Sequence, residues 1–379
     1  MTAAVVSRDA RRAEALESFR ERGMPHRRFE HWRYSDLRAI LDAGQVAQSG
    51  TAAWRIEHLP EGVELFDLAE PDAPEWVTQK LGAIGARPTM KEASLAFADG
   101  GVALRVPRGR QIAEPARLQI SSTGNVRVLL VLEEETSLTL METHTGDAGL
   151  LRNVGVEIAL AARAKLSHVR SAASALKSIS VEHIGVIEAH GAQYCAHFAN
   201  FGSRLSRTEL HILLQEEDAE AHLSGVNVLG DGGHADLTSH VEHVAGNTRS
   251  TQLFKKVAGG HSRAVYQGKI TVREGANGSD SRQTAKALLL GGRAEADLKP
   301  ELIIFADDVK CAHGAAVGDL DPESLFYLRS RGIRETEARH MLIRAFLEDA
   351  VAEIGNEELR ASLWHDVEHA LPHAMRHSS

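Results

Sequence analysis

The sequence predicts a mainly β protein with helical segments at both ends. From about residue 93 to 305, short apolar segments with period-two alternation follow one another without long helical patterns between them, as in all-β architectures. Gly, Asn and Asp punctuate these segments, which include residues 128–132, 137–140, 154–158, 211–214 and 269–272. A sandwich, a propeller and a β-helix all fit this pattern, and no strict sequence repeat singles out a solenoid.

The N-terminal part begins with a charged helix. Between Arg8 and Arg22, Ala13, Leu16 and Phe19 recur at helical spacing, and Gly23 then Pro25 follow as stop signals. We therefore expect residues 1–92 to form a helical or mixed unit, and residues 93–310 to form the β core.

The C-terminal part, residues 311–379, is expected to be helical. Asp321 can cap a helix that has Pro322 at its first position, where the missing N–H costs nothing. Two further helices are indicated by apolar stripes, one of which follows the candidate cap Asn356; the stripe residues are Met341, Leu342, Ala345 and Phe346, then Leu359, Leu363, Val367 and Leu371. The simplest role for these stripes is packing against neighbouring helices.

Composition excludes several classes of protein. The 379 residues suffice for a large core and two or three structural units. A net charge of −9 argues against a general nucleic-acid binder. No apolar run approaches the ~18 to 20 residues that span a bilayer, and the first residues show no signal-peptide pattern. Two cysteines, Cys195 and Cys311, give no disulfide framework. We expect a soluble cytoplasmic protein.

Common enzyme motifs are missing from the sequence. Gly268-Lys269 is followed by Ile270 and lacks the earlier glycine of a phosphate-binding loop. There is no dinucleotide-binding glycine fingerprint, no His-Glu-x-x-His and no Gly-x-Ser-x-Gly. We therefore expect neither ATP hydrolysis nor another common enzymatic activity.

Cys311 and His313 form the most informative pair in the chain. A thiolate and an imidazole two residues apart are ligands that iron and zinc prefer. In an extended segment both side chains point to the same face. The alternative, which spacing alone favours, is a structural cysteine beside a hydrogen-bonded histidine. Asp307, Asp308 and Lys310 either tune the charge there or form a solvated turn.

Histidine is unusually frequent elsewhere, with 20 in the chain. Most are expected to be hydrogen-bonded structural residues. His240 and His243 are a weak metal pair, because a spacing of three in a strand puts the rings on opposite faces. Cys195, beside His197, is expected to be a core residue and ranks second to Cys311 for handling sulfur.

Residues 268–350 resemble a known family over nearly their whole length. The resemblance runs through Gln283–Leu290, Lys299–Leu302, Cys311-Ala-His-Gly and Arg331-Gly-Ile, with an N-terminal echo at Glu30–Leu37. This text is similar to the SufB/SufD family of scaffold proteins in the SUF system of iron–sulfur cluster assembly. SufB typically carries Glu-His-Glu-Ala-Thr where this chain has Cys311–Ala315, so the resemblance favours the SufD branch.

The resemblance implies a right-handed parallel β-helix core and a non-enzymatic scaffold. It implies a heterodimer with SufB and a complex with the SufC ATPase, which docks on the C-terminal helical unit, where Phe346 is the candidate contact. It also implies that His313 is a ligand for a nascent cluster at the SufB–SufD interface, and that Cys311 supports it or binds sulfur. A transient iron–sulfur cluster is expected there, none is expected on the isolated chain, and a homodimer remains open for the isolated chain.

Two alternatives remain. The first is a SufB-like paralogue, from which the Cys311–Ala315 text departs. The second is a carbohydrate-active β-helix enzyme, which needs clustered carboxylates on one face of a coil. The acidic runs at residues 133–135 and 216–218 look instead like solvated loops. Neither the cluster type nor flavin binding by the assembled complex follows from the sequence.

Overall fold

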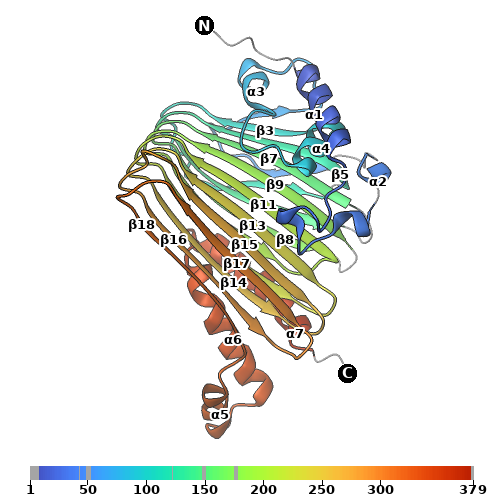
Figure 1. Ribbon diagram of the computed structural model, residues 1–379, viewed down its shortest axis with the longest axis vertical. Helices are drawn as coiled ribbons and strands as arrows, with labels where there is room; N and C mark the ends of the chain where they lie inside the picture. Colours follow the sequence, from blue (N-terminus) through green and yellow to red (C-terminus); the bar gives the residue numbers. More distant parts are fainter. Residues whose placement is uncertain are drawn as a thin grey trace.

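The core of the molecule is a parallel β-solenoid made of two stacked sheets (Figure 1). The computed structural model describes residues 8–41, 43–47, 53–121, 123–146, 151–174 and 178–376. Sheet A consists, in spatial order, of β1 (Trp54–His58), β4 (Ala116–Ile120), β6 (Ser137–Gly146), β8 (Lys165–Ser174), β10 (Gln193–Asn200), β12 (Glu220–Leu229), β14 (Arg249–Ala258), β16 (Asp280–Leu289) and β18 (Lys310–Gly318). Sheet B consists of β17 (Glu295–Ile304), β15 (Arg263–Val272), β13 (His234–His243), β11 (Leu205–Leu214), β9 (Ile179–Glu188), β7 (Leu151–Leu160), β5 (Gly124–Leu132), β3 (Gly101–Val106) and β2 (Glu64–Asp67). The expected mainly β, β-helical core is confirmed.

Each coil of the solenoid gives one strand to each sheet, and strands of successive coils pair in parallel, whereas β1 and β2 at the N-terminal edge pair antiparallel with β4 and β3. In sheet A, Gln193 pairs with Lys165 on one side and Glu220 on the other, while Arg249 pairs with Asp280. The number of residues between paired positions therefore changes from coil to coil. This variation explains why no strict repeat is visible in the sequence, although the strands themselves were apparent from their alternation.

Alternate side chains of every strand point into the solenoid, where they form its hydrophobic core. The largest cluster joins residues from both sheets over most of the stack, among them Leu140, Val156, Phe198, Leu210 and Tyr266. Such stacking lets each coil be stabilised by its two neighbours, and only the terminal coils need other cover.

At the N-terminal end, short helices cover the solenoid; they are α1 (Arg8–Arg22), α2 (Ala43–Ala47), α3 (Glu75–Lys80) and α4 (Thr89–Phe97), with 3₁₀ turns η1 (Glu30–Trp32) and η2 (Leu37–Ala39). Phe19 of α1 packs edge-on against Phe97 of α4, with ring centroids 5.5 Å apart. Together with β1 and β2, these elements are the expected N-terminal mixed region.

The segment around Trp32 clamps this region onto the outer face of sheet B. The Trp32 ring lies 4.1 Å from the guanidinium carbon of Arg207, and Arg207 donates to the carbonyl of His31 at 2.7 Å. The Ser35 hydroxyl donates to Asp236 at 2.6 Å, and Asp236 also pairs with the fully buried Arg207. The segment around Trp32-Arg33-Tyr34 therefore makes a buried contact with strands that lie far from it in the sequence.

At the other end, the chain leaves β18 for α5 (Pro322–Ser330), α6 (Glu335–Ala352) and α7 (Glu357–Ala374). The predicted caps are confirmed: Asp321 accepts from the amides of Glu323 and Ser324, and Asn356 accepts from that of Leu359. The α7 stripe does not pack only against α6, because it covers the outer face of sheet A in a cluster with Val169, Val226 and Val257. On α6 the expected stripe is only partly correct: Met341 and Ala345 are exposed, Phe346 is half-buried, and the buried residues in this cluster are Ile343, Leu347, Ala350 and Val351. Among the described helices, none is long and apolar enough to cross a membrane.

The side-chain amine of Lys256 is buried inside the solenoid, and its ionisation should make the stability of the folded chain depend on pH. Burial lowers the pKa of its ammonium to about 7. Between pH 7 and the ordinary lysine pKa, the unfolded chain binds the proton and the folded chain does not. The penalty that Lys256 imposes is therefore complete at pH 7 and below, and it shrinks as the pH rises toward 10.

We expect Lys256→Met to raise the melting temperature by several degrees at pH 6.5 and by clearly less at pH 9. The matched control is Lys255→Met, because Lys255 lies on the outer face and pairs with Asp349 at 2.7 Å. That variant should lower the melting temperature modestly. Thermal unfolding followed by circular dichroism measures both, and an equal gain at the two pH values for Lys256→Met would contradict the assignment.

Candidate functional site

Cys311 and His313 lie on β18, the last strand of sheet A. β18 pairs only with β16, in a register that places Cys311 opposite Ser281 and His313 opposite Gln283. Ser281 and Gln283 are buried and point into the solenoid. Because paired residues in a parallel ladder project to the same side, Cys311 and His313 also point inward, as the sequence predicts for an extended segment. β18 runs from Lys310 to Gly318. The β core therefore continues past residue 310, the boundary expected from the sequence.

The two residues differ in exposure. His313 is exposed although it points inward, because β18 is the terminal strand of sheet A and no described coil follows it to cover the end of the solenoid. Cys311 is partly buried against Val272, Leu302 and Val309. Burial, and next the nearby Asp280 carboxylate, raise the pKa of the Cys311 thiol above its usual value. Without a metal or another cation, Cys311 is therefore a neutral thiol at neutral pH.

The flanking acids lie in the turn between β17 and β18. Asp307 and Asp308 are exposed, and the carbonyl of Asp308 accepts from the amide of Gly278 at 2.7 Å. Their structural role is thus to close a solvated turn. The other acidic runs, at residues 133–135 and 216–218, also lie at the turns between coils.

The end of the solenoid that carries His313 is an open, partly apolar surface, here called the open end. It consists of β18 and β17, each of which is the last strand of its sheet. β17 contains Pro300, a residue that sheets accept mainly in edge strands. Three apolar side chains are exposed beside it: Ile304 by 42%, Phe305 by 62% and Val317 by 48%. A strand edge with unpaired backbone N–H and C=O groups and exposed apolar side chains is typical of a surface that pairs with another β-strand.

Cys195 lies far along sheet A, on the outer face of β10 rather than inside the core. It lines a cavity of about 240 Å³ beneath the end of α6, together with His197, His222 and Glu353. Burial, then Glu188 and Glu220, raise the pKa of Cys195 to about 11. His197 is buried, bonds Ser224 at 2.9 Å and has its pKa lowered by burial to about 3. A neutral thiol and a neutral ring form no reactive pair.

Strand pairing creates two histidine clusters that the spacing of these residues in the sequence did not predict. In the first, His211 and His240 are paired across β11 and β13, and the His211 Nε2 lies 2.7 Å from Glu242. The Nδ1 of His211 accepts from the amide of Ala86, so the ring proton is on Nε2 and is directed at Glu242, which also pairs with Arg273. The cluster therefore fastens the N-terminal region to sheet B. His243 points to the opposite face and bonds Thr248 and Ser250, as predicted.

The second cluster lies inside the solenoid. Glu142 bonds His144 at 2.5 Å and His168 at 3.0 Å, and Arg170 pairs with Glu182 at 2.8 Å. Burial alone would raise the pKa of Glu142, but the two imidazoles hold it below its usual range. Both carboxylates in this network bond basic side chains, so it has the composition of a structural network.

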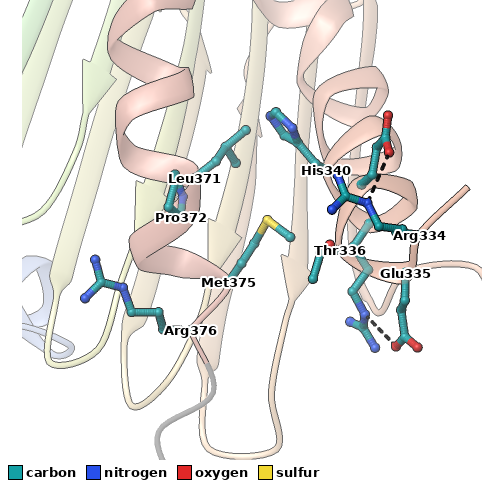
Figure 2. Close-up of a pocket in the computed structure, with 10 residues that line it drawn as sticks. Arg334, Glu335, Thr336, His340, Leu371, Pro372, Met375 and Arg376 are labelled. Atoms are coloured by element: carbon teal, nitrogen blue, oxygen red, sulfur yellow. Dashed lines mark hydrogen bonds and ion pairs between the residues drawn. The ribbon is translucent and has the colours of Figure 1, made fainter.

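The C-terminal helices also form a hollow between them. It has a volume of about 720 Å³ and lies between the start of α6 and the end of α7, as Figure 2 shows. Leu371, Pro372 and Met375 form its apolar wall. Ion pairs within α6 form its rim, including Arg339 with Glu335 at 3.3 Å.

α5 projects beyond the open end of the solenoid (Figure 1) and buries none of its residues. Phe326 is 72% exposed and Tyr327 is 57% exposed. Phe346, by contrast, is partly buried in the interface of α6 with sheet A, where the Lys255 ammonium lies 4.6 Å from its ring centroid. The exposed aromatic surface of the C-terminal unit is therefore on α5.

Comparisons with known proteins agree with this architecture. Residues 118–346 match a family model described as "SUF system FeS cluster assembly, SufBD core domain". The chain is 28% identical to the iron–sulfur cluster assembly protein SufD of Escherichia coli, over 95% of this chain and 92% of that protein. It is 26% identical to a SufBD family protein of Synechocystis, over 93% and 88% of the two chains, and 26% identical to one of Mycobacterium leprae, over 92% and 91%.

Proposed function

The chain belongs to the SufBD family of the SUF iron–sulfur cluster assembly system, and on that premise we propose that it is the SufD-type scaffold subunit, which contributes His313 as a ligand to a nascent cluster. It acts with SufB and with the SufC ATPase, hydrolyses no ATP itself and works in the cytoplasm. The cluster is its cargo and not a resident cofactor.

The observation that carries this proposal is the position of His313. It is an exposed imidazole on the inward side of an uncovered terminal strand. A ligand at the end of one solenoid faces whatever covers that end. We propose that the end of SufB covers it, through pairing of β18 or β17 and burial of Phe305 and its apolar neighbours.

The chemistry of the pair suits a site that is divided between two subunits. A stable cluster takes four ligands, usually thiolates. The open end offers one imidazole and one thiol whose raised pKa disfavours the thiolate. The remaining ligands must come from the partner. A cluster with so few ligands from each subunit is released when the two ends separate, which is what an assembly scaffold requires.

The SufC ATPase is assigned to the C-terminal unit, with α5 as the main surface. Phe346, the SufC contact expected from the sequence, is half-buried between α6 and sheet A, so in this proposal it supports the SufC surface by holding α6 in place. Phe326 and Tyr327 are exposed on a projecting helix, and large aromatic residues dominate the energetics of protein interfaces.

The test is anaerobic reconstitution with iron, sulfide and an absorbance readout. The isolated chain should hold no stoichiometric cluster, whereas the complex with SufB and SufC should assemble one. A stable cluster on the isolated monomer would overturn the divided site. Size-exclusion chromatography of the isolated chain decides in the same experiment whether a homodimer covers the open end when SufB is absent.

A further inference from the structure

Directly beneath His313, the buried side chain of Gln283 has an oxygen without a partner. Gln283 is 1% exposed and pairs in register with His313. Its Nε2 donates to the hydroxyl of Tyr266 at 2.6 Å. Its Oε1 is buried and makes no hydrogen bond. An unpaired buried carbonyl is destabilising, so folded proteins seldom leave such a group without a partner.

The Gln283 amide ends a chain of hydrogen bonds that runs deeper into the solenoid. The Ser239 hydroxyl donates to Gln252 Oε1 at 2.6 Å, and the Tyr266 hydroxyl donates to the same oxygen at 3.1 Å. Because the Tyr266 proton is used in this way, its oxygen can only accept from Gln283. In this arrangement the amide nitrogen of Gln283 faces Tyr266 and its Oε1 faces away from it.

Gly268 provides the space for this arrangement. It is buried on β15, across the interior from Gln283, and it pairs in register with Pro300 of β17. A Cβ at Gly268 would lie 1.6 Å from the Gln283 Nε2 and 2.4 Å from the Tyr266 hydroxyl. Any larger residue would therefore displace the amide. The sheet opposite is shaped to accept the Gln283–Tyr266 bond.

We propose that Gln283 is a positioning residue for His313: its Oε1 accepts a hydrogen bond from one ring N–H of His313, which leaves the other ring nitrogen free to bind metal. This inference rests on the proposed function of His313. In metal sites a ligating histidine usually donates its second ring N–H to a fixed oxygen, which sets the tautomer and the ring orientation. The Gln283 Oε1, held from below by Tyr266 and adjacent in register, is such an oxygen.

The test separates this inference from the function of His313. In the full chain labelled with ¹⁵N-histidine, two-bond nitrogen–proton correlations report the tautomer of His313, assigned by its loss in His313→Gln. We expect one dominant tautomer in the parent chain and a mixture in Gln283→Met. Tyr266→Phe, which keeps Gln283 but frees its amide to rotate, should give the same mixture.

Gln267→Met is the matched control. Gln267 is also a buried glutamine, but it lies on the outer face of sheet B and bonds His31 and Thr238. Its loss should leave the His313 tautomer unchanged. In the complex with SufB and SufC, Gln283→Met should slow cluster assembly by about 10-fold or more. An unchanged tautomer in Gln283→Met would overturn the positioning role even if His313→Ala abolishes assembly, whereas normal assembly in His313→Ala would overturn the function itself.

Discussion

Replacing His313 by alanine is expected to reduce cluster assembly in the complex with SufB and SufC by at least 100-fold. The substitution removes the one exposed imidazole on the inward side of β18, and no neighbouring side chain on that strand can supply a nitrogen ligand. The fold should persist, because His313 is exposed and belongs to none of the hydrophobic clusters of the described residues. Anaerobic assembly followed by absorbance measures the effect.

Two controls make the result specific. His222→Ala removes a partly exposed histidine from the outer face of sheet A, where its ring bonds Thr251 at 2.8 Å, and should leave assembly unchanged. Cys195→Ala should also have little effect, since that thiol lies beneath α6. Cys311→Ser separates a sulfur ligand from a packing residue: a defect without a loss of thermal stability indicates the ligand. If His313→Ala assembles clusters normally while remaining folded, His313 is not a ligand.

The strands of the solenoid could be predicted from the sequence, but their stacking could not. Period-two alternation depends only on which side of a strand is buried, so segments such as Ser137–Leu140 are apparent locally. The pairing of Gln193 with Glu220, and of Arg249 with Asp280, depends on turns whose lengths differ. The resemblance to the SufB/SufD family supplied the architecture that the periodicity left open.

For the candidate site, the sequence indicated Cys311 and His313 but not the residues that surround them. Cys311 and His313 are neighbours in the chain, so their shared face followed from strand geometry alone. Gln283 lies a whole coil earlier, and Tyr266 and Gly268 belong to the opposite sheet. Their contact with the site depends on register across the solenoid, which a single sequence does not contain. The His211–His240 pair was missed for the same reason.

The C-terminal helices show a second limit of pattern-based prediction. The apolar stripe of α7 was attributed to packing between helices, and it instead completes a core with Val226 and Val257 of sheet A, to which α6 contributes Ile343 and Leu347 and not the exposed Met341 of its predicted stripe. Removing the helices would expose those strands. A stripe shows that a face is buried, but it does not show which surface buries it. The partner surface must therefore be tested by point substitutions and not by truncation.

Replacing Phe326 and Tyr327 together by serine is expected to weaken binding of the SufC ATPase by at least 100-fold without changing the fold. Both side chains are more than half exposed on α5, a helix that buries none of its residues, so their loss removes no core contact. Truncating two central aromatic anchors typically costs ~2 kcal/mol or more for each, and about 1.4 kcal/mol corresponds to tenfold in affinity.

Phe305→Ser is the matched control for this double variant, because Phe305 is an equally exposed aromatic residue at the open end. It should weaken the pairing with SufB and leave SufC binding intact, whereas the α5 variant should do the reverse. Calorimetry with SufC and pull-down with SufB separate the two surfaces. If the α5 variant binds SufC with unchanged affinity, the docking surface is not α5, and the hollow between α6 and α7 around Met375 becomes the surface to substitute next.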